Sequence, residues 1–403
     1  MSSRELDEGG RWLLPDGVEE ILPPRAQRIE ALRRRLLDEF DLWGYELVMP
    51  PLLEYLDSLL VGVGSDLDLQ TLKITDQLTG RLMGLRADIT SQAVRIDAHA
   101  LRREGPTRLC YAGTVLRARP EGLFGSRAPI RIGAELYGLV GPAGDAEVLA
   151  LMARTLAAAG VSPVHIELGH VAIYRALADA AGLAPDVERR LFDAVQRKAR
   201  ADIDALLEEA ATAEELAEMI RQLPALIGGP EVMARARAVL QGAPAAVHAA
   251  LDALEETVAR VARRVPELEL GFDLSELHGY NYHTGTVFSA YADDHGDAVA
   301  RGGRYDDIGR AFGRARPATG FDADLKLLAE LGTLAPEARR TLAMPADEDL
   351  DAAQAEALWR RVAVLRAAGV RVVPATDATA TLEQLVFRDG DWQPQAAPAD
   401  GER

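Results

Sequence analysis

The feature that most constrains the fold is a pair of extended apolar runs, residues 108–116 and 130–140, joined by a short loop rich in Gly, Pro and Arg. A loop of this length cannot make the crossover that parallel strands require, so the two runs are predicted to pair antiparallel. A hairpin is predicted at 69–85, where short apolar runs flank turn residues. Helices separate these strands without strict alternation, which predicts an α+β fold and not a doubly wound one.

Apolar residues at helical spacing, Ile29, Leu32, Leu36 and Phe40, predict a helix that follows Pro24 and is ended by Gly44. A second helix is expected at 144–159, and a long stretch rich in Ala, Leu, Glu and Arg predicts a helical insertion at about 173–264. A last core helix is expected to begin near Phe321. Further strands are predicted, in chain order, at 163–168, 268–274, 286–291 and 298–300.

The change in pattern near residue 335 predicts a domain boundary. Residues 1–335 are expected to form the main core, and residues 336–393 a small C-terminal α/β segment with a helix at 351–367 and a strand at 370–374. The polar stretch 394–403 is expected to be a disordered tail.

Composition excludes several classes of protein. The chain is 48% hydrophobic and 27% charged, without an apolar run near the roughly 20 residues of a membrane span, so it is expected to be cytoplasmic. Cys110 is the only cysteine and no two histidines stand four apart, so neither a disulfide nor a metal is predicted. The fragment Gly62-x-Gly64 lacks the third glycine of a dinucleotide fingerprint, and no cofactor is predicted. The net charge of −18 argues against a nucleic-acid partner, although acidity equally serves solubility.

Several segments between residues 13 and 331 resemble the signature motifs of class II aminoacyl-tRNA synthetases. Residues 44–54 resemble motif 1, with Pro51 at the position of its dimer-interface proline. Residues 85–90 resemble the segment whose carboxylate holds the substrate amino group, which would be Asp88 here, although in isolation an exposed turn acid is the simpler interpretation.

The most specific resemblance is to histidyl-tRNA synthetase. Residues 111–117 and 131–138 match its motif 2 in spacing, with Arg117 at the motif arginine, Arg127 at a loop arginine and Glu135 at the histidine-binding glutamate. Residues 278–288 are similar to the stretch that marks histidine specificity, and residues 301–306 and 317–321 to the approach to motif 3.

The resemblance implies a class II synthetase-like antiparallel sheet flanked by helices and a pocket for histidine. Glu135 is expected to meet the ammonium of the ligand, and Arg131 departs from the glutamine usual at its position. The histidine-binding residues implied are Asp88, Thr90, Arg117, Arg131, Glu135, Tyr282 and His283.

Residues needed for amino-acid activation are missing. Attack of a carboxylate on ATP requires fixed positive charge at the transition state, and the resemblance places one such arginine at His278 and another at Leu327. Asp324 adds negative charge where polyphosphate would lie, and Arg119 replaces a motif 2 glutamate. We therefore predict that Arg119, Arg127, His278, Asp324 and Leu327 mark a degraded ATP site and that the chain has no catalytic residues.

A histidine pocket without activation chemistry is similar to what is found in the regulatory subunits of ATP phosphoribosyltransferase. This resemblance implies a non-catalytic subunit in the first step of histidine biosynthesis, which mediates feedback control by free histidine. It also implies a synthetase-like dimer that assembles with the short-form catalytic subunit into a hetero-octamer and does not bind tRNA. The alternatives are a divergent histidyl-tRNA synthetase and a tRNA-binding sensor module; binding to tRNA would distinguish the latter.

Overall fold

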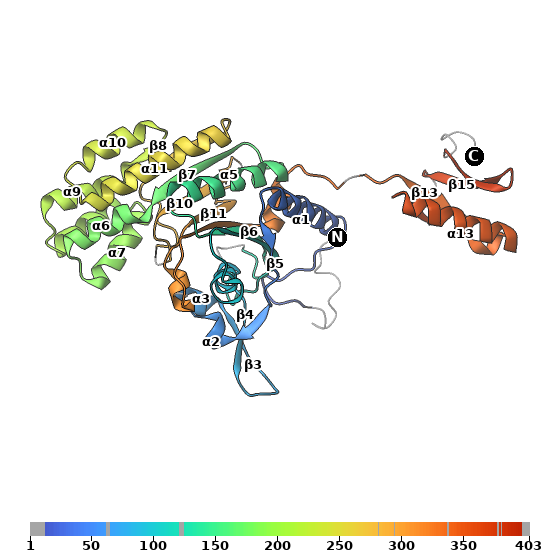
Figure 1. Ribbon diagram of the computed structural model, residues 1–403, viewed down its shortest axis with the longest axis horizontal. Coiled ribbons are helices and arrows are strands. Elements are labelled where there is room, and N and C mark those ends of the chain that lie inside the picture. Colours follow the sequence, from blue (N-terminus) through green and yellow to red (C-terminus); the bar gives the residue numbers. More distant parts are fainter. Residues whose placement is uncertain are drawn as a thin grey trace. The chain divides into compact units, whose positions relative to one another are not determined.

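The computed structural model describes residues 13–61, 65–120, 125–280, 282–293, 295–336, 338–376, 379 and 381–396. The chain forms two compact units that divide between Ala335 and Pro336 (Figure 1). The fragment Gly62-x-Gly64 and residues 397–403 of the expected tail lie outside the described residues.

Within the described residues, nine strands form the central sheet of the first unit in the order β1-β5-β6-β12-β11-β10-β7-β9-β8. Neighbouring strands are antiparallel except for the pairs β1–β5 and β7–β9. The predicted pairing of the two central runs is confirmed, because Cys110 of β5 lies opposite Ala134 of β6. The strands are β1 (Glu46–Leu47), β5 (Thr107–Thr114), β6 (Ile130–Tyr137), β7 (Val164–His170), β8 (Ile227–Gly228), β9 (Glu269–Asp273), β10 (Thr286–Ala292), β11 (Ala300–Arg304) and β12 (Ala318–Asp324).

One face of this sheet is covered by helices α1 (Arg25–Leu42), α5 (Pro142–Ala159), α11 (Ala245–Arg264) and α12 (Leu325–Leu331) (Figure 1). Helix α1 buries the apolar stripe that predicted it, since Leu36 and Phe40 are fully buried in the core beneath. The predicted helical insertion is present as α6 (Val171–Ala181), α7 (Pro185–Gln196), α8 (Arg200–Glu209), α9 (Glu214–Gln222), η2 (Leu223–Ala225), α10 (Glu231–Val239) and α11. None of the helices in the described part of the chain is long and apolar enough to cross a membrane.

The opposite face of the sheet carries smaller elements. The predicted hairpin is confirmed as β3 and β4. Together with β2 these strands form a three-stranded sheet in the order β2-β4-β3. The remaining elements of the first unit are β2 (Leu53–Tyr55), α2 (Leu56–Leu59), α3 (Ser65–Gln70), β3 (Leu72–Thr75), β4 (Leu82–Leu85), α4 (Thr90–Arg95), η1 (Ile96–Leu101) and η3 (Ile308–Phe312).

The prediction of a helix beginning near Phe321 is wrong. Residues 318–324 form strand β12 in the middle of the sheet, and helix α12 begins only at Leu325. The side chain of Asp324 accepts a hydrogen bond from the Lys326 backbone and so caps the helix. The strand predicted at 298–300 is also displaced, because β11 begins at Ala300.

The second unit has a core of its own, in which Leu358 and Val362 of the helix pack on Trp392 and Leu342 of the sheet. The expected helix and strand are present, together with an unpredicted strand, β13, that pairs in parallel with both β14 and β15. The elements of this unit are β13 (Thr341–Met344), η4 (Asp347–Asp349), α13 (Ala352–Ala367), β14 (Arg371–Pro374), β15 (Glu383–Arg388) and β16 (Asp391–Gln395). The α+β prediction, with a helical insertion and a small C-terminal α/β segment, is therefore confirmed.

Candidate functional site

The alternation of side chains along β6 and β12 creates the candidate site. Ile132 and Ala134 join the core beneath the helices, and successive residues of a strand point to opposite faces of its sheet. Glu135 therefore faces the side away from the helices, opposite Gly320 of β12. Two neighbouring cavities lie beside these strands, the first on this side and the second reaching Leu327 of helix α12.

The first, which we call the Glu135 cavity, has a volume of about 190 Å³. Six of the seven residues expected to bind histidine line it, whereas Arg117 does not. His278, which was assigned to the degraded ATP site, lies in this cavity instead. The lining residues are Asp88, Thr90, Arg131, Glu135, His278, Tyr282, His283, Arg301, Gly302, Tyr305, Gly320, Phe321 and Asp322.

Glu135 is the most enclosed acid of the cavity, with 1% of its surface exposed. The hydroxyls of Tyr111 and Tyr305 donate hydrogen bonds to its two carboxylate oxygens. The Tyr282 ring stacks on Tyr305 with ring centres 4.9 Å apart, so this end of the cavity is aromatic. Burial raises the pKa of the Glu135 carboxyl to about 8, which leaves the group largely protonated at neutral pH in the empty cavity. A hydrogen bond donated by a ligand would favour its ionised form.

Two further acidic residues, Asp88 and Asp322, lie at the other end of the cavity. The Arg131 guanidinium forms an ion pair of 2.9 Å with Asp322. Burial, reinforced by the charge of Asp322, raises the pKa of the Asp88 carboxyl, whereas Arg131 acts in the opposite direction. The Ser91 amide donates to Asp88 at 3.3 Å and fixes the carboxylate at the start of α4. This end is therefore polar and contains both signs of charge.

The two histidines of the cavity are held by contacts with oxygen atoms of the protein. Nδ1 of His283 donates to the carbonyl oxygen of His278 at 3.0 Å, and burial lowers the pKa of His283 to about 3, so the ring is neutral. Both ring nitrogens of His278 contact oxygens. Nε2 contacts the carbonyl oxygen of Gly302 at 3.2 Å, and Nδ1 contacts the side-chain carboxylate oxygen Oε1 of Glu276 at 3.1 Å. His278 is thereby directed at the protein and not at a bound phosphate.

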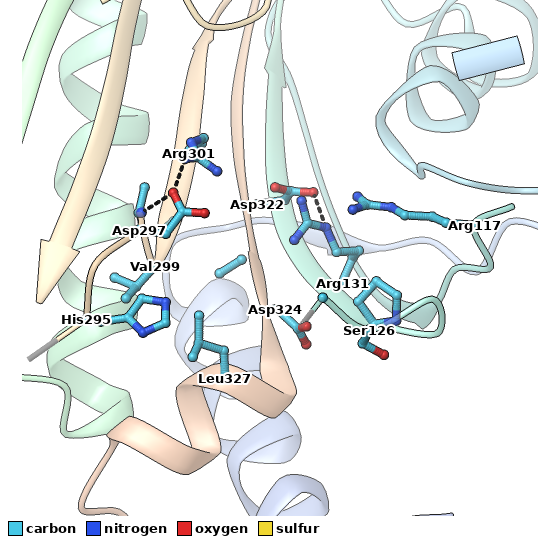
Figure 2. Close-up of a pocket in the computed structure, with 15 residues that line it drawn as sticks. Arg117, Ser126, Arg131, His295, Asp297, Val299, Arg301, Asp322, Asp324 and Leu327 are labelled. Carbon is cyan, nitrogen blue, oxygen red and sulfur yellow. Dashed lines mark hydrogen bonds and ion pairs between the residues drawn. The ribbon is translucent and has the colours of Figure 1, made fainter. Parts of the chain in front are cut away.

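The second cavity, which we call the Leu327 cavity, has a volume of about 150 Å³ and is shown in Figure 2. The Arg131–Asp322 ion pair and Arg301 line both cavities, and Arg117 extends from the loop after β5 toward the same region. Leu327 presents an apolar side chain where the resemblance implies an arginine. The pKa of Asp324, which also lines this cavity, is raised by burial.

Two residues assigned to the degraded ATP site lie outside both cavities. Arg119 is exposed. Arg127 is fixed in place by the N-terminal segment, since its backbone amide donates to Gly17 and its Nε donates to the carbonyl oxygen of Arg117 at 2.9 Å. The Arg127 guanidinium thus holds together the loop between β5 and β6.

Asp322, Arg301 and Tyr305 also line the Glu135 cavity, although the sequence did not predict them there. Asp322 was missed because its segment was assigned to a helix. Arg301 and Tyr305 stand in the stretch that resembles the approach to motif 3, and that stretch was the available signal. In β11, Arg301 lies opposite Asp322, which places both at the polar end.

Comparisons with known proteins show what the chain is similar to. The histidyl-tRNA synthetase family profile matches residues 17–328. A protein of Ectopseudomonas mendocina described as an ATP phosphoribosyltransferase regulatory subunit is 55% identical over 392 residues, which cover 95% of this chain and 97% of the relative. A protein of Alkalilimnicola ehrlichii with the same description is 55% identical over 375 residues, with 93% and 92% of the two chains covered.

Solved structures show the same fold. A Bacillus halodurans protein, described as an ATP phosphoribosyltransferase regulatory subunit/histidyl-tRNA synthetase, is 26% identical and superposes with a TM-score of 0.81 over 95% of this chain and 99% of its own. The histidyl-tRNA synthetase of Nostoc is 18% identical, with a TM-score of 0.77 and coverage of 96% and 97%.

Proposed function

We propose, for a chain that belongs to the histidyl-tRNA synthetase family and within it to the ATP phosphoribosyltransferase regulatory subunits, that the Glu135 cavity binds free histidine and mediates feedback control. The enzyme that such a subunit regulates acts in histidine biosynthesis. The single observation that supports a histidine site is the enclosed carboxyl of Glu135 within a wall of tyrosines.

An imidazole ring fits this aromatic end. It is planar, it can stack on tyrosine, and its N–H can donate to a carboxylate that is shielded from water. From the sequence, Glu135 was expected to meet the ammonium of the ligand. The geometry favours the imidazole there, because Asp88 and Asp322 provide separate carboxylates at the polar end for the ammonium.

Binding of histidine can control activity only if the two states of the complex bind it differently. The relatives are described as regulatory subunits, which implies a catalytic partner. We propose that this partner is the short-form catalytic subunit, joined in a hetero-octamer built on a synthetase-like dimer. The Glu135 cavity would then be the input of the signal, and the chemistry would take place in the partner.

The test is a titration of the assembled complex with histidine. Glu135→Ala should weaken binding by well over tenfold, because losing one partner of a desolvated charged contact costs about 2 to 5 kcal/mol. It should relieve inhibition and leave the uninhibited rate unchanged. Glu104→Ala, at a side chain that is 99% exposed, is the matched control. Identical inhibition curves for all three proteins would refute sensing at this cavity.

We also propose that the chain does not activate histidine. Leu327 and Asp324 support this, because they place an apolar and an acidic side chain where a polyphosphate would need cations. The purified chain should therefore show no histidine-dependent exchange of pyrophosphate into ATP. Exchange clearly above a blank without histidine would overturn this part of the proposal.

A further inference from the structure

The turn at residues 278–283 connects the Glu135 cavity to the helical insertion. It supplies His278, Tyr282 and His283 to the lining of the cavity. The backbone amide of His283 donates to the carbonyl oxygen of Gly279 at 2.7 Å, which closes the turn. Gly279 has a φ of +63°, and a Cβ atom there would come within 2.6 Å of Nδ1 of His283. Because the turn is wound so tightly, a displacement of its backbone moves these lining residues together.

Arg175 of helix α6 binds the end of this turn from the side of the insertion. Its Nη2 donates to the carbonyl oxygens of Tyr280 at 2.9 Å and His283 at 3.1 Å. The Arg175 guanidinium also lies over the Tyr280 ring, 4.8 Å from the ring centre. Hydrogen bonds from an ionised donor are roughly twice as strong as neutral ones. Arg175 therefore fixes the backbone of a residue that lines the cavity, although its own side chain lies outside the lining.

The side chain of Tyr280 anchors the same turn in the insertion. Its ring packs against Tyr174 of α6, with ring centres 5.5 Å apart, and against Phe192 of α7, with ring centres 4.9 Å apart. Its hydroxyl donates to Glu188 of α7 at 2.9 Å. Tyr280 thus joins an aromatic cluster of the insertion, whereas Tyr282, two residues later, lines the cavity.

The insertion also holds the chain where it leaves β9 toward this turn. Strand β8 of the insertion pairs with β9, with Ile227 opposite Asp273. Nζ of Lys198, between α7 and α8, donates to one carboxylate oxygen of Asp273 at 2.8 Å. The other oxygen accepts from the backbone amide of Ser275 at 2.8 Å and from its hydroxyl at 2.6 Å. The stretch from Asp273 to His283 is therefore tied to the insertion at both ends.

We propose that Arg175 is a positioning residue for the histidine cavity, and that histidine binding and the packing of α6 and α7 on the 278–283 turn stabilise each other. This inference rests on the proposed histidine site and adds its connection to the insertion. Coupling of this kind is reciprocal, so a variant that loosens the turn weakens histidine binding, and histidine slows local opening of the insertion. The apparent affinity falls in proportion to the fraction of molecules whose turn is correctly placed.

The first measurement is calorimetric titration of the full chain with histidine. Arg175→Gln should weaken binding by at least about tenfold, the scale of one charge-assisted hydrogen bond. Tyr280→Phe keeps the ring and removes only the hydroxyl contact with Glu188, so it should weaken binding by about threefold. Arg190→Gln is the matched control in the same insertion. Arg190 pairs with Glu209, both side chains are about half exposed, and the affinity should stay within about twofold.

The second measurement, hydrogen exchange, separates positioning from a general loss of stability. Each protein is compared without histidine and with histidine at one hundred times its own Kd. In the wild type and in Arg190→Gln, exchange of the α6 and α7 amides should slow by at least about tenfold, because an opening that displaces the turn also releases the ligand. In Arg175→Gln this protection should fall below about threefold, whereas the protection of α5, in the main core, should be the same in all three proteins.

Three outcomes contradict the proposal or separate it from the proposed function. If the wild type binds histidine and Arg175→Gln keeps its affinity within about twofold, or keeps the protection of α6 and α7, only this inference fails. If Arg175→Gln does not fold, Tyr280→Phe decides, and an unchanged histidine affinity there overturns the inference. If the wild type itself binds no histidine, the proposed function fails, and this inference fails with it.

Discussion

At the scale of single residues, glycines make room for the charged groups of the site. Gly320 lies opposite Glu135 between β12 and β6, and Gly133 lies opposite Asp322. A Cβ atom on Gly320 would overlap the Glu135 carboxylate, and one on Gly133 would come within 2.6 Å of the Tyr111 hydroxyl. Glu135 and Asp322 therefore each lie opposite a glycine, which has no side chain to compete for the space.

Gly320→Ala is therefore expected to displace the Glu135 carboxylate. The added methyl should lower the free energy of unfolding by about 1 to 3 kcal/mol, the usual cost of overpacking, and weaken histidine binding by at least tenfold. Denaturant unfolding and calorimetric titration measure the two effects. Gly296→Ala is the control, because a Cβ there meets nothing within 4 Å. Unchanged histidine affinity in Gly320→Ala would show that Glu135 does not contact the ligand.

The sequence located most of the lining residues because motif spacing on a strand also fixes the face. Arg131 and Glu135 are four residues apart on β6 and therefore lie on the same face of the sheet. Once the motif places one of them in the cavity, the other is placed there too. His278 could not be placed in this way. It lies in a turn, where side-chain direction depends on contacts with Glu276 and Gly302 that no periodicity encodes.

At the scale of elements, helix α6 depends on a histidine at its N-terminus. Nδ1 of His170 accepts a hydrogen bond from the Ala172 backbone amide, which requires a neutral ring. Burial lowers the pKa of His170 to about 4, and the positive charges of Arg304 and Arg175 act in the same direction. The cap that joins β7 to α6 is thus sensitive to acid.

The sign of the effect follows from linkage. The pKa of His170 is lower in the folded chain, about 4, than the roughly 6.5 of an unfolded one, so its contribution is fully present above about pH 6.5 and is lost as the pH falls toward 4. His170→Asn keeps a capping acceptor but does not titrate, so the free energy of unfolding should fall less steeply over this range than in the wild type. The difference should be on the order of 3 kcal/mol. Parallel pH profiles for the two proteins would contradict it.

The matched control is His99→Asn, at an exposed histidine of η1. Its pH profile should follow that of the wild type, including the contributions of His283 and Glu135, which titrate in all three proteins. A flatter profile in His99→Asn as well would mean that the slope does not arise at the cap of α6.

The elements predicted best are those with one clear period. Helix α1 is one, because four buried residues mark its inner stripe. Strand β12 was missed because Phe321 and Ala323 face the helices while Gly320 and Asp322 face the cavity, an alternation concealed by the helical apolar run that begins at Leu325. Sequence alone does not reveal that a short polar segment crosses the middle of a sheet, since one of its two partner strands, β6, comes from a distant part of the chain.

At the scale of the whole molecule, the two compact units have separate cores. The core of the second unit is built around Leu358, Val362 and Trp392, and none of its buried residues belongs to the clusters of the first. Every residue that lines the Glu135 cavity or the Leu327 cavity lies before residue 336. The site and the C-terminal unit are thus built from different parts of the chain.

Removing residues 336–403 should therefore leave histidine affinity within about twofold of that of the full chain, because no contact of the Glu135 cavity is lost. Histidine should also stabilise the truncated chain against denaturant by about 2.7 kcal/mol at a concentration one hundred times its Kd, since a ligand that binds only the folded state stabilises by mass action. Glu135→Ala in the truncated chain is the control and should lose most of this stabilisation at the same histidine concentration. The measurement is denaturant unfolding of both truncated proteins with and without histidine, beside calorimetric titration of the full chain. A folded truncated chain that no longer binds histidine would show that the second unit completes the site. In that case, the signal from histidine would have to pass through residues 336–403.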